Sequence, residues 1–319
     1  MSQTAEPIPV VVVLGPTASG KTALAVQLAR EFNGEIISQD SRQVFRGMDI
    51  GTAKPTQDER DVVPHHGLDL VSPNETWTLA EQQGMTYETV ERLHRAGRLP
   101  LLVGGTGQYL RAVLEGWTVP KAPPDAAFRD QLAEEADLYG VPALHERLRK
   151  IDPPAADKIM PNDLRRITRA LEVWQVTGVR ISEQQRAAPP PYRTLLLGLT
   201  MDRPALYARI DRRVQRMLET GLLAEIKHLL EAGYDWDLPA LRTIGYGEFQ
   251  PYWEGQTELA VCAERVRYDS HRFARHQYIW FRRFESVEWL DASLPETAER
   301  ARWRIEKQLI NVNDVSNGV

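Results

Sequence analysis

Residues 15–22 have the types and the spacing that bind phosphate groups. Their sequence, GPTASGKT, fits the pattern G-x-x-x-x-G-K-[ST], in which glycines allow main-chain N–H groups to approach phosphate oxygens closely. Lys21 adds a positive charge, and the hydroxyl of Thr22 can hold Mg²⁺. A valine-rich strand is predicted before this phosphate loop and a helix after it, which disfavours a turn without a ligand. The predicted phosphate-binding residues are Gly15, Pro16, Thr17, Ala18, Ser19, Gly20, Lys21 and Thr22.

Two further loops carry side chains that can do chemistry near this phosphate loop. Asp40 follows a short strand predicted over residues 35–38, and Thr106 lies in a glycine-rich turn after a strand predicted over residues 99–103. In open parallel sheets, ligands bind beyond the carboxyl ends of the strands, so both side chains are expected on the rim that carries the phosphate loop. Asp40 is therefore a candidate general base or metal ligand. The alternative is that it caps a following helix.

Three basic segments could contact a phosphate or a nucleic acid. On one predicted helix, the face opposite an apolar stripe carries Arg209, Arg212, Arg213 and Arg216. Such a face can close over a leaving group beside a polyphosphate, but it can equally be solvated surface. Three more arginines, in residues 162–169, allow the same two interpretations. A helix predicted over residues 258–284 interleaves arginines with aromatic residues, which suits unstacked RNA bases, although a half-buried helix would show the same mixture.

Composition restricts the class of protein. The formal net charge of −5 gives no overall attraction to nucleic acid, so RNA contact must come from local basic patches. The single cysteine, Cys262, excludes a disulfide framework and favours a reducing, cytoplasmic compartment. No apolar run reaches the roughly 18 residues of a membrane span. Two adjacent histidines, His65 and His66, cannot point the same way on a strand, and no further ligand stands at zinc-site spacing.

The order of the predicted elements indicates an α/β fold, with a parallel sheet flanked by helices. Strands are predicted over residues 10–14, 35–38, 99–103, 192–201 and 287–290, and helices lie between most of them. Between two proline-containing linkers, near residues 117–124 and 187–191, only helices are predicted. We therefore expect the first part of an α/β core over residues 1–120, an inserted all-helical domain over residues 121–190, and the second part of the core over residues 191–319.

Taken together, these motifs resemble the bacterial tRNA dimethylallyltransferase family, also called tRNA isopentenyltransferases. The resembling segments are residues 15–22, 40–55, 64–69, 104–109, 162–182, 209–223 and 241–246. Seven ordered blocks at the family's spacing are far more specific than a phosphate loop alone. The resemblance implies a P-loop NTPase-like core, in which the loop holds the diphosphate of a prenyl donor instead of ATP.

The resemblance also implies a reaction. A dimethylallyl group passes from dimethylallyl diphosphate to N6 of adenosine 37, in tRNAs that read codons beginning with U, and diphosphate leaves. Lys21, Arg213 and Mg²⁺ bound at Thr22 would stabilise the departing diphosphate. Asp40 would act as the general base for the adenine amine. Thr106 would help to hold either Asp40 or the adenine.

The implied RNA partner is the anticodon stem-loop with its A36-A37-A38 run. The target base must leave the stack to be modified, and the inserted domain would clamp the stem-loop. The implied tRNA-binding residues are Asp40, Ser41, Arg42, Gln43, Thr106, Phe128, Leu164, Arg165, Arg166, Ile167, Thr168, Arg169, Arg242, Gly245, Tyr246, Arg275 and Gln277. No membrane partner is expected, and the enzyme is expected to be a monomer.

The sequence departs from the family pattern in the late helix. Residues 274–280 read ARHQYIW where the family pattern is A-K-R-Q-x-T-W, and Ser270-His271 replaces a Thr-Arg pair. Phe45 stands where a Tyr is usual. Two other functions share some of the motifs. One is a P-loop kinase. Against it, residues 104–105 are Gly-Gly, where a kinase would have a magnesium-binding Asp. The other is a nucleotide-switched RNA-binding protein, in which Asp40 would have no special task.

Overall fold

The structure is a computed structural model that describes residues 6–120, 122–184 and 186–309. Contacts within the chain divide it into two compact units. The larger unit comprises Met1–Val113 and Pro191–Val319, and the smaller unit comprises Leu114–Pro190. Residue 121, at which the inserted domain is expected to begin, lies outside the described residues, and the smaller unit starts earlier, at Leu114.

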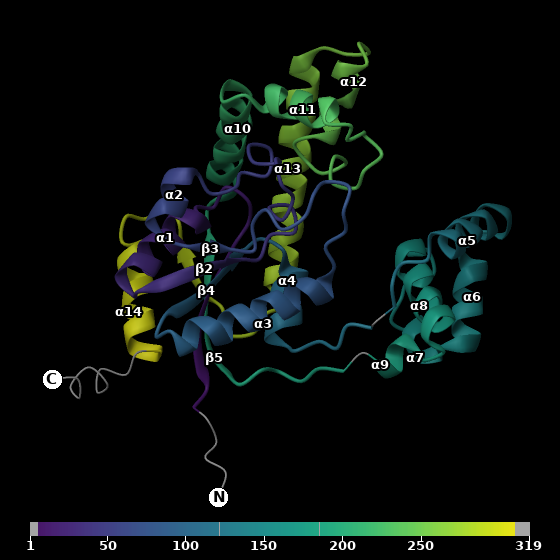
Figure 1. Ribbon diagram of the computed structural model, residues 1–319, viewed down its shortest axis with the longest axis horizontal. Helices are drawn as coiled ribbons and strands as arrows, with labels where there is room; N and C mark the ends of the chain where they lie inside the picture. Colours follow the sequence, from purple (N-terminus) through teal and green to yellow (C-terminus); the bar gives the residue numbers. More distant parts are fainter. Residues whose placement is uncertain (1–5, 121, 185, 310–319) are drawn as a thin grey trace, which may run out of the picture. The chain divides into compact units, whose positions relative to one another are not determined.

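The larger unit is built on a six-stranded parallel sheet with strand order β3-β2-β4-β1-β5-β6 (Figure 1). The strands are β1 (Ile8–Leu14), β2 (Gly34–Ser38), β3 (His65–His66), β4 (Leu99–Gly104), β5 (Tyr192–Thr200) and β6 (Glu288–Asp291). Strand β1 pairs with β4 on one side and with β5 on the other. Its valines at positions 10–13 are fully buried, as a continuous apolar run in a central parallel strand requires. The predicted α/β fold is confirmed.

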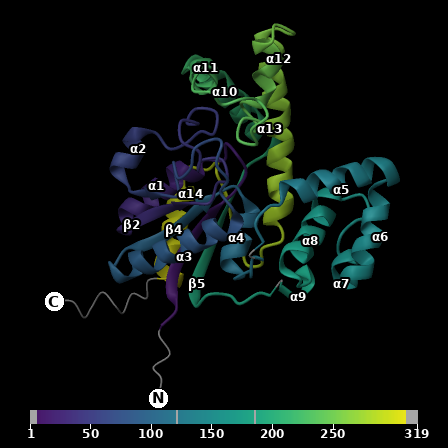
Figure 2. The same ribbon diagram turned by 45° about the vertical axis from the view of Figure 1, so that its right-hand side comes forward.

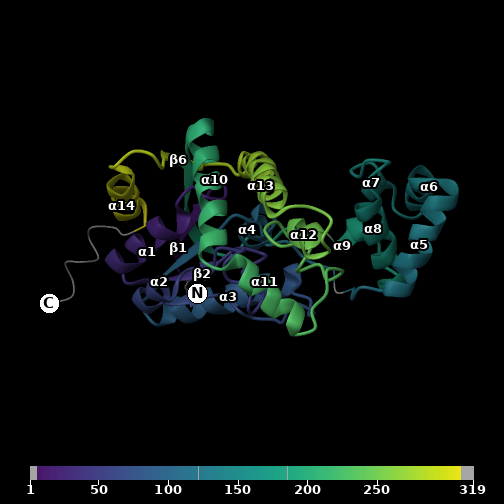
Figure 3. The same cartoon turned by 90° about the horizontal axis from the view of Figure 1, so that it is seen from above.

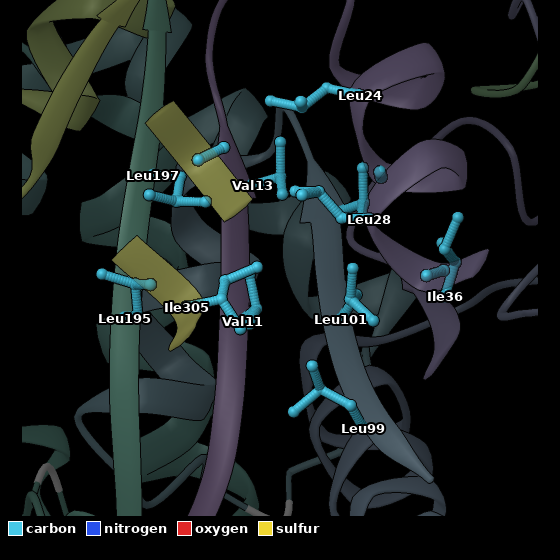
Figure 4. Packing of buried hydrophobic residues seen from close by; sticks show 14 of the residues in the cluster. Val11, Val13, Leu24, Leu28, Ile36, Leu99, Leu101, Leu195, Leu197 and Ile305 are labelled. Atoms are coloured by element: carbon cyan, nitrogen blue, oxygen red, sulfur yellow. The ribbon is translucent and has the colours of Figure 1, made fainter. Parts of the chain in front are cut away.

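Helices of the larger unit follow the strands. They are α1 (Lys21–Glu31), α2 (Gln57–Val62), α3 (Leu79–Arg95), α4 (Gly107–Leu114), α10 (Arg203–Glu219), α11 (Leu222–Glu231), α12 (Gln250–Trp253), α13 (Leu259–Phe281) and α14 (Thr297–Gln308), with the short 3₁₀ helix η1 (Gly247–Phe249). On one face of the sheet, Leu24 and Leu28 of α1 and Ile305 of α14 pack against Val11 and Val13 of β1 (Figure 4).

Helices α10 and α13 lie side by side in the larger unit (Figures 2 and 3). Ile210 of α10 packs with Ala274 of α13, and the rings of Tyr207 and His271 stack with their centroids 4.0 Å apart. Helix α10 ends before Gly221, whose φ of 106° is unfavourable for other residues. The break predicted there is confirmed. Because α10 and α13 support each other, their inward side chains are held over the carboxyl ends of the strands.

Within the described part of the smaller unit, the regular elements are helices, apart from an isolated bridge between Trp117 and Ala187. Its helices are α5 (Ala126–Tyr139), α6 (Val141–Ile151), α7 (Pro153–Ala156), α8 (Leu164–Thr177) and α9 (Ile181–Gln184). Asp125 and Asp163 cap α5 and α8 by accepting main-chain hydrogen bonds. Fully buried leucines, Leu132, Leu144 and Leu148, form much of the core.

Candidate active site

A cavity of about 580 Å³ lies in the larger unit beyond the carboxyl ends of β1, β2 and β4. It brings together the three loops that the sequence places on this rim. Lys21 and Thr22 come from the phosphate loop, Asp40 follows β2, and Thr106 follows β4. Arg213 of α10 completes the charged part of the lining. One cavity therefore contains every residue that was expected to take part in the chemistry.

The phosphate loop has the backbone that anion binding requires. Gly20 has a φ of 97°, and Ala18 is also in the left-handed region, with a φ of 62°. A side chain at Gly15 would come within 2.9 Å of the main-chain oxygen of Leu199. The buried hydroxyl of Ser19 has no hydrogen-bond partner among the described residues. These main-chain conformations form a concave nest, which directs N–H groups toward an anion.

Charges of both signs converge at this loop. Burial in the cavity wall lowers the pKa of the Lys21 ammonium from 10.5 to about 8, while Asp40 raises it and Arg213 lowers it further. The ammonium donates a hydrogen bond of 2.8 Å to the carbonyl of Pro16. Burial also lowers the pKa of Arg213, and Asp40 again opposes that shift. Two partly buried cations next to one carboxylate favour an added anion such as a diphosphate.

Arg213 differs in position from Arg212 and Arg216 of the same helix. Its Nη1 donates a hydrogen bond of 3.1 Å to Oγ1 of Thr17 in the phosphate loop. Arg212 and Arg216 are exposed and do not line the cavity. From the sequence, this basic face could either close the site or be solvated. In the structure Arg213 lines the cavity, whereas Arg212 and Arg216 are solvated.

Asp40 and Thr106 belong to two interlocked loops. The Asp40 carboxylate accepts a hydrogen bond of 2.9 Å from the N–H of Arg42, and no helix follows, so the helix-cap interpretation is wrong. The N–H of Ser41 donates to Oγ1 of Thr106 at 3.0 Å. A Cβ at Gly104 would lie 2.1 Å from the carbonyl oxygen of Gln39, so the two loops touch through their main chains. Thr106 thus holds the loop that carries Asp40.

Two polar side chains of α3, which the sequence did not single out, support the loop that carries Asp40. The fully buried amide of Gln39 donates to Oγ1 of Thr86, and the amide of Gln82 donates to the carbonyl of Ser38. Gln82 and Thr86 are four residues apart on one buried helix face. Uncharged polar residues at that spacing on an otherwise apolar face are the signal that could have found them.

Part of the cavity wall is apolar. It includes Ile210, Val214 and Met217 of α10, together with Val266 of α13 and Ile244. The apolar stripe of α10 is evident from the periodicity of the sequence, but its place in the site is not. Because this wall begins beside Arg213, a ligand with a charged head at the phosphate loop can lay a short hydrocarbon against it.

The loop between β2 and α2 is fixed by ion pairs and hydrogen bonds around the buried Lys54 and around Glu225. The buried Lys54 ammonium contacts Asp49 at 2.7 Å and Asp69 at 2.5 Å. On the other side, Glu225 accepts hydrogen bonds from the main-chain N–H groups of residues 49, 50 and 51 and one of 2.6 Å from the hydroxyl of Tyr246. Residues 51–53 of this loop line the cavity, so the network holds that part of the wall in place.

The predicted tRNA-binding residues of the larger unit fall into two groups. Ser41, Arg42, Gln43, Arg242 and Gly245 line the cavity, and the exposed Arg275 donates to the hydroxyl of Tyr207. The side chains of Tyr246 and Gln277 are buried, with 0% and 4% exposure. Tyr246 therefore supports the surface around it, whereas Gln277, although almost wholly buried, also forms part of the cavity lining.

The predicted residues of the smaller unit divide in the same way. Arg165 and Arg166 are exposed, and Leu164 and Thr168 are half-buried. Phe128 and Ile167 lie in the hydrophobic core of the unit. Arg169 donates to the buried carboxylate of Glu172 at 2.6 Å, so it also has a structural task.

His65 and His66 face opposite ways, as predicted. His66 contacts Glu35 at 2.7 Å, whereas His65 lines the cavity and holds its Nδ1 2.7 Å from the carbonyl of Val63. Burial lowers the pKa of His65. A neutral imidazole whose Nδ1–H is used by a carbonyl presents Nε2 as an acceptor.

The donor set of the cavity suits Mg²⁺ held largely by a ligand. No cluster of three His, Cys, Asp or Glu side chains able to hold a metal exists among the described residues. The cavity does offer the hydroxyl of Thr22 and the carboxylate of Asp40. Mg²⁺ is commonly bound by few protein oxygens together with phosphate oxygens and waters, which fits this set.

Comparisons with known proteins point to one family. The model described as "IPP transferase" matches residues 43–284, and the model "Isopentenyl transferase" matches residues 8–64. A "tRNA dimethylallyltransferase" of Roseiflexus sp. (strain RS-1) is 52% identical over 92% of this chain and 96% of the relative. One from Thermomicrobium roseum is 47% identical over 96% and 93%.

Solved structures agree. A full-length tRNA isopentenylpyrophosphate transferase from Bacillus halodurans has a TM-score of 0.72 at 40% identity, covering 97% of this chain and 99% of that chain. A eukaryotic dimethylallyltransferase acting on tRNA has a TM-score of 0.81 at 30% identity, covering 97% of this chain and 80% of that chain. Helices of the described part are too short or too polar to cross a membrane.

Proposed function

This chain belongs to the IPP transferase family, and we propose that it transfers a dimethylallyl group from dimethylallyl diphosphate to N6 of adenosine 37 in tRNAs that read codons beginning with U. Prenyl transfer to tRNA follows from the family. The donor, the target atom and the residue roles are the proposal. The observation that carries it is the convergence of Lys21, Arg213 and Asp40 in one cavity with an apolar wall.

The leaving group sets the first requirement. An allylic diphosphate ionises readily, so the site must stabilise negative charge as it builds on the departing diphosphate. The main-chain N–H groups of residues 18–22, the ammonium of Lys21 and the guanidinium of Arg213 supply that stabilisation. Mg²⁺, where bound at Thr22, would neutralise further charge on the diphosphate oxygens. The apolar wall beside Arg213 takes the dimethylallyl group and keeps water away from it.

The nucleophile sets the second requirement. An adenine amine is a weak nucleophile and must lose a proton as the new C–N bond forms. Asp40 lines the same cavity, and its loop is held by the hydrogen bond from Ser41 to Thr106, so its carboxylate can accept that proton. The base reaches the cavity only after it leaves the anticodon-loop stack. Arg42 and Arg242, at the cavity lining, are placed to meet its phosphates.

The remaining parts of the proposal concern the partner and the setting. The exposed Arg165 and Arg166 of the smaller unit supply positive charge for the anticodon stem. The enzyme acts in the cytoplasm as a monomer, with Mg²⁺ as its cofactor. Each statement is open to direct measurement.

The deciding experiment separates prenyl transfer from phosphoryl transfer. Protein, Mg²⁺ and a tRNA pool are incubated with labelled dimethylallyl diphosphate or with ATP labelled in its γ-phosphate, and the nucleosides are then analysed by mass spectrometry. We expect the prenyl label on adenosine alone, with diphosphate as the second product. Label that entered RNA only from ATP would contradict the proposal and favour the kinase. Tight tRNA binding without any transfer would favour the RNA-binding protein.

A further inference from the structure

One buried side chain connects the phosphate loop with the turn that follows β4. The proposed reaction needs these two loops at a fixed distance from each other. The Oε1 atom of Gln277 accepts a hydrogen bond of 2.8 Å from the N–H of Thr17, in the phosphate loop. The Nε2 atom of the same amide donates one of 3.0 Å to the carbonyl of Gly105. Gln277 is only 4% exposed and comes from α13, which is remote in sequence from both loops.

The fit at this amide is tight. A Cβ at Gly105 would lie 2.3 Å from Nε2 of Gln277, so only glycine allows the amide to approach. One turn along α13, Trp280 packs against Gly107, where a Cβ would lie 2.8 Å from its side chain. The start of α4 is thus held against α13 at two successive positions. Thr17 is also fixed from α10, because its hydroxyl accepts from Arg213.

The connection continues to the proposed base. Residue 106 follows Gly105, and the Thr106 hydroxyl accepts from the N–H of Ser41, next to Asp40. The Thr106 N–H donates to the carbonyl of Gln39 at 3.1 Å, on the other side of Asp40. An unbroken series of short contacts therefore runs from Thr17 through Gln277 to the two neighbours of Asp40.

We infer that Gln277 is a positioning residue that fixes the distance between the phosphate loop, residues 15–22, and the proposed base Asp40. This inference rests on the proposed function, in which the transferred carbon lies between the leaving diphosphate and the attacking amine. Such a transfer depends on that spacing, and a misplacement of about 1 Å can cost roughly a hundredfold in rate. Both polar atoms of the Gln277 amide are used in hydrogen bonds to these loops, so it acts through the two loops. The resemblance instead implies that Gln277 contacts tRNA, and the two roles predict different measurements.

The test compares Gln277→Met, which keeps the length of the side chain and removes both hydrogen bonds, with Gln57→Met. Gln57 is an exposed glutamine on α2, outside the cavity, and serves as the matched control. Single-turnover transfer is measured at saturating dimethylallyl diphosphate and tRNA, and the dissociation constants of Mg²⁺–pyrophosphate and of tRNA are measured separately. For Gln277→Met we expect the transfer rate to fall about 10- to 100-fold, with both dissociation constants within about threefold of wild type and a melting temperature that, although lowered, stays well above the assay temperature.

A second readout does not depend on turnover. In the wild-type chain, Mg²⁺–pyrophosphate should slow amide hydrogen exchange in residues 104–109 and 39–41 as well as in the phosphate loop. In Gln277→Met the slowing should be confined to the phosphate loop. Gly105→Ala, which displaces the amide from the other side, should reproduce both the rate loss and the confined protection.

Three results would overturn the inference. A tenfold weaker tRNA complex with normal single-turnover transfer would assign Gln277 to RNA contact. A loss of pyrophosphate affinity as large as the rate loss would restrict the role of Gln277 to the phosphate loop. Wild-type transfer together with wild-type slowing of amide hydrogen exchange would show that Gln277 positions neither loop. Failure of the proposed function is distinguishable, because the wild-type chain itself would then transfer no prenyl group.

Discussion

The guanidinium of Arg213 lies 3.1 Å from Oγ1 of Thr17, although the two residues are 196 positions apart in the chain. This contact brings α10 over the phosphate loop and leaves the cation beside the main-chain donors of residues 18–22. An arginine so placed can follow the charge that moves onto a departing diphosphate, which a distant surface arginine cannot.

Replacing Arg213 by Gln should lower the transfer rate by roughly a hundred- to a thousandfold, the cost of removing one oriented donor to a developing charge. The shorter, neutral side chain cannot neutralise the diphosphate. Single-turnover transfer measures this loss. Arg212→Gln, on the exposed side of the same helix, should stay within about twofold of wild type. Equal losses in the two variants would show that the overall charge of α10, and not the position of Arg213, matters.

Replacing Asp40 by Asn should reduce transfer by about a hundredfold or more, the usual contribution of a general base. The amide oxygen of Asn can still accept the hydrogen bond from the N–H of Arg42, so the loop keeps its shape. Binding of tRNA, measured by filter retention, should change by less than about threefold. Asp58→Asn, in an exposed position on α2, is the control. Loss of tRNA binding with chemistry retained would assign Asp40 to RNA recognition instead.

The lowered pKa of Lys21 predicts a pH limit on donor capture. Burial lowers this pKa to about 8, so the ammonium is charged below pH 8 and becomes neutral above it. Since a charged ammonium attracts the diphosphate, kcat/KM for the donor should fall with rising pH through about 8. This ratio reports the free enzyme, where the lowered value applies. In Lys21→Met, kcat/KM for the donor should be low at every pH and should not fall further through pH 8. If the fall through pH 8 persists in this variant, it belongs to another titrating group.

How far the sequence predicts the fold depends on how local its signals are. The valines of β1, the glycines of the phosphate loop and the break at Gly221 are local signals with a direct physical meaning, and the structure confirms all three. Strand β3 spans only two residues, His65 and His66. Such a strand is too short to show an alternating pattern, so only its pairing with β2 reveals it.

The site is predictable where a residue follows a strand, and not where a helix approaches from far along the chain. Asp40 and Thr106 were placed correctly because the carboxyl ends of parallel strands share one edge. For Arg213, periodicity indicated the helix face but not the neighbour that this face meets. For Gln277, the partner loop lies 260 residues away, and a glutamine among arginines and aromatic residues resembles a surface position.

Removal of Mg²⁺ should abolish transfer, and Thr22 should determine how tightly the ion is held. A chelator should stop the reaction, and added Mg²⁺ should restore it. In Thr22→Ala, half-maximal activity should need about ten times more Mg²⁺ or more, because the hydroxyl ligand is lost. Thr22→Ser keeps the hydroxyl and should remain within about threefold of wild type. Full activity in the chelator would show that the protein's own cations, Lys21 and Arg213 among them, suffice for the diphosphate.

Stability of the smaller unit should depend on pH through Glu172. Burial alone would raise the pKa of this side chain, but hydrogen bonds from Arg129, from the main-chain N–H of Asp125 and from Arg169 lower it from 4.5 to about 2. Because the pKa in the folded state lies below the ordinary value, the added stability is complete above about pH 4.5 and is lost as the pH falls toward 2. Acid should therefore open this unit through the protonation of one buried carboxylate.

Glu172→Gln tests this dependence. The neutral amide leaves Arg129 and Arg169 without their buried counter-charge, at a cost of about 2 kcal/mol, below the usual range because both arginines can rehydrate. Amide hydrogen exchange in α5 and α8 at pH 7 should accelerate by roughly thirtyfold. The variant should also lose most of the acid sensitivity seen in wild type. Glu134→Gln, at an exposed position on α5, should leave exchange unchanged; if it accelerates exchange as much as Glu172→Gln does, the buried ion pair is not the cause.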